Sequence, residues 1–228
     1  MDGIWMGNNA RDARLEFENA KVALVKAGVG QQDIVDAALT QSYLRLEQLL
    51  PAGVNQIQFP ILNNQTGNSA AIRSNERRLN LQDAFYVAGM SVFLSKCTSA
   101  TTGLMPLSSY PNPDLFTIGG AQPAPLWDFY GGSFEIKVNG TTILPAYPLS
   151  DFYDSPQTQQ TAAAASGFPI DQLNAAKRIS LQPNPVFIGQ KNTIFNVNLN
   201  TPLAAVDAFT YIVIIAHGIL AQNVTIVS

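Results

Sequence analysis

The chain has 228 residues, of which only 13% are charged, and its formal net charge is −3. Because ordinary domains carry about 25% charged residues, this composition favours a protein whose outer faces are buried against copies of itself or other subunits. The acidic balance disfavours a nucleic-acid-binding face, which needs clustered Lys and Arg to displace counterions from phosphates.

The N-terminal region is predicted to begin with a helix. Asn8 or Asn9 provides the cap, and Gly28 follows the end of the helix. Phe17 and Leu24, with Ala20 between them, recur at helical spacing.

A second helix is predicted from Gln31 to Leu50, before Pro51. Its apolar residues fall on one stripe of a helix: Val35, Leu39, Tyr43, Leu46 and Leu50. We interpret this stripe as a packing and contact surface rather than a cofactor site. A charge at Leu39 is therefore expected to leave a folded monomer that cannot assemble.

From Val54 onward the pattern changes to that of strands. Ile57, Phe59 and Ile61 alternate with polar residues or proline, as in a half-buried strand. The run from Phe85 to Leu94 is almost continuously apolar, which predicts a strand covered on both faces. These two segments indicate a β-rich domain.

A β-hairpin is predicted around Asn139 and Gly140. Ser133–Asn139 alternates apolar and polar residues, and Thr141–Ile143 follows the Asn-Gly pair. A two-residue type I′ turn needs positive φ at both positions, which Asn-Gly supplies.

Further strands are predicted toward the C-terminus, at residues 195–199, Phe209–Ala216 and Val224–Val227. We expect the core to be formed by the strands at Phe85–Leu94, Phe134–Val138 and Phe209–Ile215. Pro- and Gly-marked loops are expected at Thr98–Pro125 and Ser155–Gly167, and a short helix at Gln172–Lys177. Short strands joined by turn-rich loops are typical of a sandwich or jelly roll. The sequence thus predicts a mainly β fold, a single jelly roll or β-sandwich at 54–228, with an N-terminal helical segment at 1–53.

The residues that catalysis or metal binding needs are scarce. The one histidine, His217, is expected at the end of an apolar strand, and the one cysteine, Cys97, excludes an internal disulfide. A single His and a single Cys do not make the usual zinc site, and no Gly-x-Ser-x-Gly segment occurs. We therefore expect no enzyme activity, no catalytic residue, no cofactor and no metal.

Two alternatives remain open. Asp151 and Asp154 form a carboxylate pair that an enzyme or a cation could use, although turn capping explains them as well. A carbohydrate-binding or receptor-binding β-sandwich, of fibre-head or adhesin type, is the stronger alternative. It would present aromatic side chains that flank the hairpin: Trp127, Phe129, Tyr130, Tyr147, Phe152 and Tyr153. These aromatics would otherwise belong to the core or to a subunit interface.

Five segments between Arg77 and Asn223 have a distinctive order of residues: Arg77-Arg78-Leu79-Asn80 leading into Asp83-Ala84-Phe85, Ser109-Tyr110-Pro111-Asn112-Pro113 with Phe116, Phe129-Tyr130-Gly131-Gly132, Asp151-Phe152 with Pro156-Gln157-Thr158-Gln159, and Gly218-Ile219-Leu220-Ala221-Gln222-Asn223. In these segments the chain resembles bacteriophage virion proteins. The resemblance implies a jelly-roll capsid-type structural protein of a tailless or membrane-containing phage.

These observations together predict a capsid shell subunit that self-assembles through symmetric interfaces. Its expected partners are copies of itself and other virion proteins, with no direct nucleic-acid binding and no small-molecule substrate. The N-terminus lacks a basic region followed by an apolar core, and no apolar run reaches the roughly 18 residues of a membrane-spanning helix. We therefore expect synthesis in the host cytoplasm and a final location in the virion.

Overall fold

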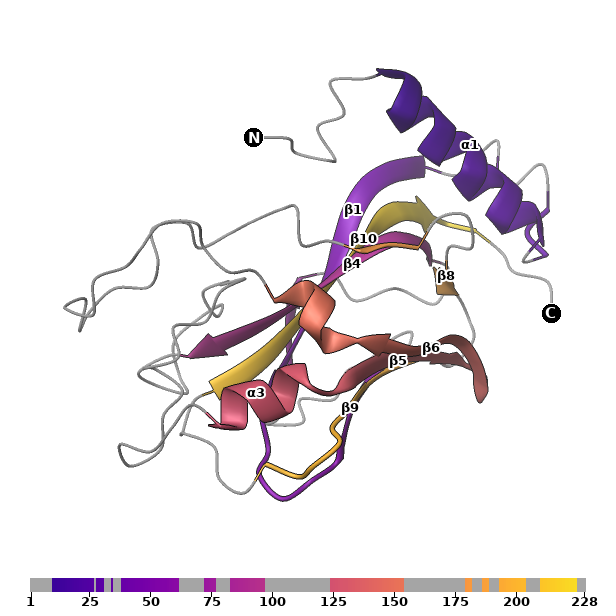
Figure 1. Cartoon of the computed structure of the whole chain (residues 1–228). Helices are drawn as coiled ribbons and strands as arrows, with labels where there is room; N and C mark the ends of the chain where they lie inside the picture. The colour runs from indigo at the N-terminus through magenta and orange to yellow at the C-terminus, as the bar shows by residue number, and fades with distance from the viewer. Residues whose placement is uncertain are drawn as a thin grey trace.

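The computed structural model describes residues 10–26, 28–30, 34, 38–61, 72–76, 83–96, 124–153, 179–181, 186–188, 193–203 and 210–224. Two antiparallel sheets pack face to face, and helix α1 (Ala10–Lys26) lies outside one of them (Figure 1). The predicted mainly β fold, a sandwich with an N-terminal helix, is confirmed.

The larger sheet has six strands. Along its path lie β3 (Ile72–Glu76), β1 (Ala38–Leu49), β10 (Thr210–Gln222), β4 (Ala84–Lys96) and β7 (Ile179–Ser180), while β8 (Val186–Ile188) also pairs with β4. The smaller sheet has four strands in the order β2 (Gln56–Ile61), β9 (Thr193–Asn198), β5 (Ser133–Val138) and β6 (Thr141–Pro148). Two short helices, α3 (Ala124–Tyr130) and η2 (Leu149–Phe152), flank the β5–β6 hairpin in sequence.

The strand pairs are nested about this hairpin. Moving outward along the chain from β5 and β6, β4 pairs with β7 and β8, β2 pairs with β9, and β1 pairs with β10. The ladders of β10 with β4 and of β9 with β5 then complete the two sheets. The chain is therefore arranged as one long, folded-over hairpin whose successive pairs alternate between the sheets.

The main core fills the space between the two sheets. The inward residues of β4, β5 and β10 belong to it, as predicted, and β4 and β10 are buried on both faces over most of their length. In β4 the inward set changes from Phe85 and Val87 to Met90, Val92 and Leu94. That change of parity coincides with a bulge in the β4–β10 ladder beside Gly218.

Helix α1 covers part of the outer face of the larger sheet. Ala20 packs there with Tyr86, Ala88 and Ile219, and Leu24 belongs to a neighbouring cluster. The predicted first helix, with its buried face on Phe17, Ala20 and Leu24, is confirmed.

The predicted second helix is wrong over Ala38–Leu49, which forms β1 and pairs with β10 through twelve consecutive residues. Leu44 and Leu46 face the core, whereas Arg45 and Glu47 occupy the opposite face, so the true period is two. Within the predicted helical segment at 1–53, the described helical residues are therefore those of α1 and Ile34, whereas β1 belongs to the sandwich. Leu39 packs in part beneath α1, so its proposed role in assembly loses its basis.

The predicted hairpin is confirmed. Asn139 and Gly140 have φ values of 50° and 78°, as a type I′ turn requires. The predicted helix at 172–177 and the loop at 155–167 lie outside the described residues, as does most of the loop at 98–125. Of the predicted final strand only Val224 is described, and β10 ends before it at Gln222.

Candidate functional site

The outer face of α1 carries a second apolar stripe. Leu15, Val22 and Val25 are 52%, 52% and 46% exposed, at spacings of seven and three residues. Such spacing places the three side chains on one side of a helix, opposite the buried Ala20 and Leu24. Glu18 lies on the same side, and its carboxylate is 3.3 Å from the Lys21 ammonium. The helix therefore exposes three apolar side chains, with charged side chains among them, on the side away from the sandwich.

The sequence identified α1 but not this second stripe. Leu15, Val22 and Val25 are present in the sequence at helical spacing, but Glu18 and other charged residues lie among them, so the pattern does not stand out from that of an ordinary amphipathic surface helix. Isolated exposed apolar residues are ordinary, whereas a contiguous exposed set marks a contact surface.

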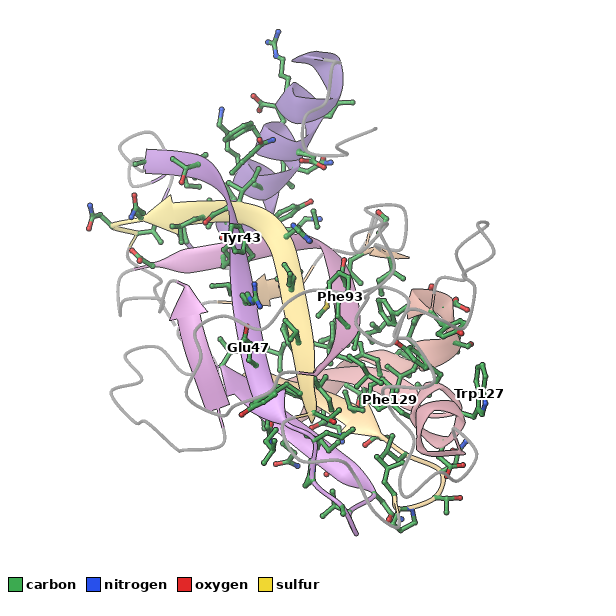
Figure 2. The ribbon with its side chains drawn as sticks, turned by 90° about the vertical axis from the view of Figure 1, so that its left-hand side faces the viewer. Tyr43, Glu47, Phe93, Trp127 and Phe129 are labelled. Atoms are coloured by element: carbon green, nitrogen blue, oxygen red, sulfur yellow. The ribbon has the colours of Figure 1, made fainter. Side chains whose placement is uncertain are left out.

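The predicted aromatic residues divide into three groups. Trp127 is 51% exposed, Tyr147 and Tyr153 are half-buried, and Phe129, Tyr130 and Phe152 are buried. In Figure 2, Trp127 lies at the margin of the molecule, while Phe129 from the same helix lies toward the sandwich. These residues therefore do not form one exposed platform, and among them only Trp127 is exposed.

The Trp127 ring has aromatic neighbours beneath it. Its centroid is 5.7 Å from that of Tyr153, and Tyr153 is in turn 4.8 Å from Tyr130. Tyr130 also contacts Phe129 edge to face at 5.1 Å. A continuous aromatic path thus leads from the surface into the main core.

Tyr147 packs against the main core, which is one of the two roles that the sequence allowed for it. Its ring packs on Phe152 at 5.8 Å, and its hydroxyl donates a hydrogen bond to Asp151. Burial, followed by this bond to a carboxylate, raises the pKa of Tyr147. Asp151, which belongs to η2, is therefore the hydrogen-bond partner of Tyr147 in β6. Asp154, the other residue of the predicted carboxylate pair, lies outside the described residues.

A charged pair occupies the outer face of β1. The Arg45 guanidinium bonds the Glu47 carboxylate, and both side chains are buried. Across the ladder stand Ile215 and Val213, which cluster with Phe93 and Tyr211 (Figure 2 labels Glu47 and Phe93). The sequence missed this pair because the helical assignment separated Arg45 from Glu47, whereas residues two apart share one face of a strand.

Polar side chains form a network on the outward face of the smaller sheet. Glu135 accepts hydrogen bonds from Asn196 at 3.2 Å and Thr142 at 3.1 Å, and its carboxylate is 3.1 Å from the Lys137 ammonium. Beside it, Gln58 donates to Gln56, which donates to Asn198. Burial of the Glu135 carboxyl opposes ionisation, but bonds from Lys137, Asn196 and Thr142 outweigh it and hold the pKa below its usual value.

This lowered pKa predicts how stability depends on pH. A carboxyl group whose pKa is lower in the folded state than in the unfolded state stabilises the protein at pH values above the unfolded-state pKa, which is about 4. This stabilisation is lost as the pH falls through the folded-state pKa. In Glu135→Gln the contribution is absent, so the unfolding free energies of the two proteins should converge as pH decreases below about 4. Urea unfolding at a series of pH values tests this. A constant difference at every pH would show that Glu135 does not titrate as inferred.

The other residues considered from the sequence for catalysis or metal binding are His217 and Cys97. His217 lies inside β10, opposite Tyr43 and Gly89, rather than at the strand's end, and it is half-buried. Cys97 lies outside the described residues. Within the described ranges, no three His, Cys, Asp or Glu side chains gather in a way that would hold a metal ion. In the same ranges, no helix has the length and apolar character to span a membrane.

Comparison with known proteins gives no match to any protein family, curated protein or solved structure.

Proposed function

We propose that this chain is a virion structural protein, a capsid shell subunit that assembles through symmetric interfaces. The fold supports the proposal through its strand order. Two four-strand sets, β1-β10-β4-β7 and β2-β9-β5-β6, are nested as one folded hairpin, as a jelly roll would require, and β3 is added at one edge. Jelly rolls build many viral capsids, although lectins and cupins use them too, so fold alone does not decide function.

The observation that carries the assembly role is the outer stripe of α1. The helix uses one face to dock on the larger sheet and leaves Leu15, Val22 and Val25 exposed. A lone domain gains no stability from that second stripe, whereas an assembled shell buries it. The low charge content, 13% of the chain, agrees with surfaces that face other subunits.

The location of α1 leaves it accessible for a contact with another subunit. It lies outside the larger sheet, on the side away from β5 and β6 (Figure 1). A contact through α1 therefore leaves the sandwich core intact. In a closed, symmetric shell, the outer stripe of α1 on every copy would make the same contact with a neighbouring subunit.

The test is the assembly state of purified protein with and without a charge in the stripe. Val22→Lys should reduce association at least about tenfold, or about 1.4 kcal/mol, because an ammonium would replace an apolar contact. The helix itself should keep its stability, since Lys is a better helix former than Val. Light scattering across a concentration series measures the mass, and electron microscopy shows whether closed particles form.

Thr141→Lys is the matched control, because it adds the same charge at an exposed site on the other sheet. It should associate like the unmodified chain. A chain that remains monomeric at all concentrations contradicts the shell proposal. Assembly that Val22→Lys leaves unchanged contradicts only the role of α1.

A further inference from the structure

The smaller sheet has an open edge at β2. This strand pairs with β9 on one side, and no described strand pairs with its other side. Asn55, Gln56 and Gln58 are exposed. The outer side of an edge strand presents backbone N–H and C=O groups that another strand can bind. The sandwich can therefore be extended by a further strand at β2.

The other edges of the two sheets carry features that block such an extension. β6 contains Pro145 and Pro148, and its ladder with β5 is irregular. β3 contains Arg73 and Glu76, while β7 and β8 are only two and three residues long. Charges, prolines, irregular ladders and very short strands are the usual protections of an edge. Gln56–Phe59 has no charge and no proline, and its ladder with β9 is regular.

One backbone hydrogen bond shows which residues of β2 face the open edge. Leu199 N–H donates to the carbonyl of Asn55 at 2.7 Å, so this carbonyl points toward β9. Because a trans peptide unit is planar, the N–H of Gln56 points the opposite way, and so does that of Gln58 by alternation along the strand. Pro60 has the same parity, so the N–H that proline lacks would also have pointed away from β9.

The side chains along this edge can pair with copies of themselves. Gln58 Nε2 donates to Gln56 Oε1 at 2.9 Å, and Gln56 Nε2 donates to Asn198 Oδ1 at 2.8 Å. A carboxamide both donates and accepts, so glutamines on two identical strands can bond one another across a two-fold axis. A charged residue in the same place would meet its own charge, which destabilises a strand pair. The edge therefore fits a second β2 better than a charged strand.

We propose that β2 pairs antiparallel with β2 of a second copy of this chain, about a two-fold axis at Ile57. Gln56 of each copy then lies opposite Gln58 of the other, and the two residues exchange backbone N–H···O=C bonds. Pro60 lies beyond these bonds. Opposed residues have the same parity, so Ile57 and Phe59 remain on the core side. The smaller sheets of the two copies become one continuous sheet.

As an interface of the shell, this pair rests on the proposed function and gives it a two-fold contact separate from α1. The helix lies against the larger sheet, whereas β2 is an edge of the smaller one. The pair also forms in a simple dimer. The two proposals can therefore fail separately.

Hydrogen exchange across a concentration series tests the pairing within one strand. The amides of Gln56 and Gln58 should exchange freely in dilute protein and slow by at least about tenfold as the dimer forms. The amides of Ile57 and Phe59 point toward β9 and should stay protected at every concentration, which makes them the internal control. Free exchange of the glutamine amides at all concentrations contradicts the pairing. Protection that does not depend on concentration contradicts it too, because another part of the same chain would then occupy the edge.

Gln58→Pro is the second test, because it removes an N–H that faces away from β9. The monomer should keep its urea unfolding midpoint, since an edge strand tolerates proline at such a position. Light scattering should show a dimer dissociation constant raised at least about tenfold. Gln58→Thr is the matched control. It keeps the backbone N–H and suits a strand, so dissociation should change by no more than about threefold.

The possible results separate this pair from the shell. An unchanged dimer in Gln58→Pro contradicts the pair. An unfolded monomer contradicts it as well, because the N–H would then be bonded within the chain. Dimers that Gln58→Pro dissociates but that never enlarge to closed particles support the pair and contradict the shell. Closed particles that Gln58→Pro leaves intact support the shell and contradict the pair.

Discussion

Phe134→Asp is expected to prevent folding. Phe134 is completely buried in the main core, and its ring centroid lies 6.2 Å from Phe152 and 5.9 Å from Phe195. Removing a buried phenyl ring costs about 3–5 kcal/mol, and an unpaired buried carboxylate adds several more. Together these losses match the total stability of a typical domain, about 5–15 kcal/mol. The measurement is the yield of folded protein, followed by circular dichroism and urea unfolding.

Two controls isolate the cause of this loss. Phe134→Leu keeps an apolar side chain and should cost only about 1–3 kcal/mol, leaving a cooperative transition. Ile143→Asp places the same charge on an exposed residue of β6 and should change stability by about 0.5 kcal/mol or less. A Phe134→Asp protein that unfolds at the urea concentration of the unmodified chain would exclude β5 from the core.

The strands that a local sequence pattern specifies could be predicted from the sequence. Asn139-Gly140 leaves few alternatives to a type I′ turn, and that turn fixes the pairing of β5 with β6. The apolar runs of β4 and β10 were identified as buried because no polar face interrupts them. The prediction succeeded where a local pattern determines the element.

The β1 strand shows where local pattern was insufficient. Residues 38–50 include five Leu, two Gln, one Arg and one Glu, all of which favour helices, and their apolar residues also fit a helical stripe. Pairing with β10 along twelve residues, with Leu44 and Leu46 inside, outweighed that propensity. This pairing joins residues about 170 positions apart, such as Leu44 and Ala216. A local pattern in a single sequence does not indicate which distant segments pair.

The candidate sites were predictable in part for the same reason. The sequence identified Trp127, Tyr130 and Tyr153 as binding candidates, but which of them faces water depends on how α3 and η2 pack. Trp127 is exposed and Tyr130 is buried, although they are only three positions apart. The stripe on α1 likewise becomes visible only once the opposite face is known to be occupied by Ala20 and Leu24.

Gly218→Ala is expected to have the second large effect. A Cβ atom at Gly218 would lie 1.7 Å from the carbonyl oxygen of Tyr86 and 2.8 Å from its carbonyl carbon. These are backbone atoms of the adjacent strand, so no side-chain rotation relieves the overlap. Gly218 stands where the β10–β4 ladder shifts register, and the shift keeps both Val87 and Met90 facing the core. The strands must separate locally, which we expect to cost more than about 3 kcal/mol.

Gly131→Ala is the matched control for this substitution. Its added Cβ would come no closer than 3.2 Å to another atom, the carbonyl oxygen of Trp127, and the site is exposed. A change of about 1 kcal/mol or less is expected there, and urea unfolding of both variants beside the unmodified chain measures the difference. Hydrogen exchange adds a local readout, because amides of β4 and β10 near the bulge should lose protection in Gly218→Ala before those of β5 and β9 do. Equal stability of the two variants would mean that β4 and β10 are not in the register described. The strand order behind the jelly-roll inference depends on that same ladder, so this one substitution also tests the topology that supports the proposed shell role.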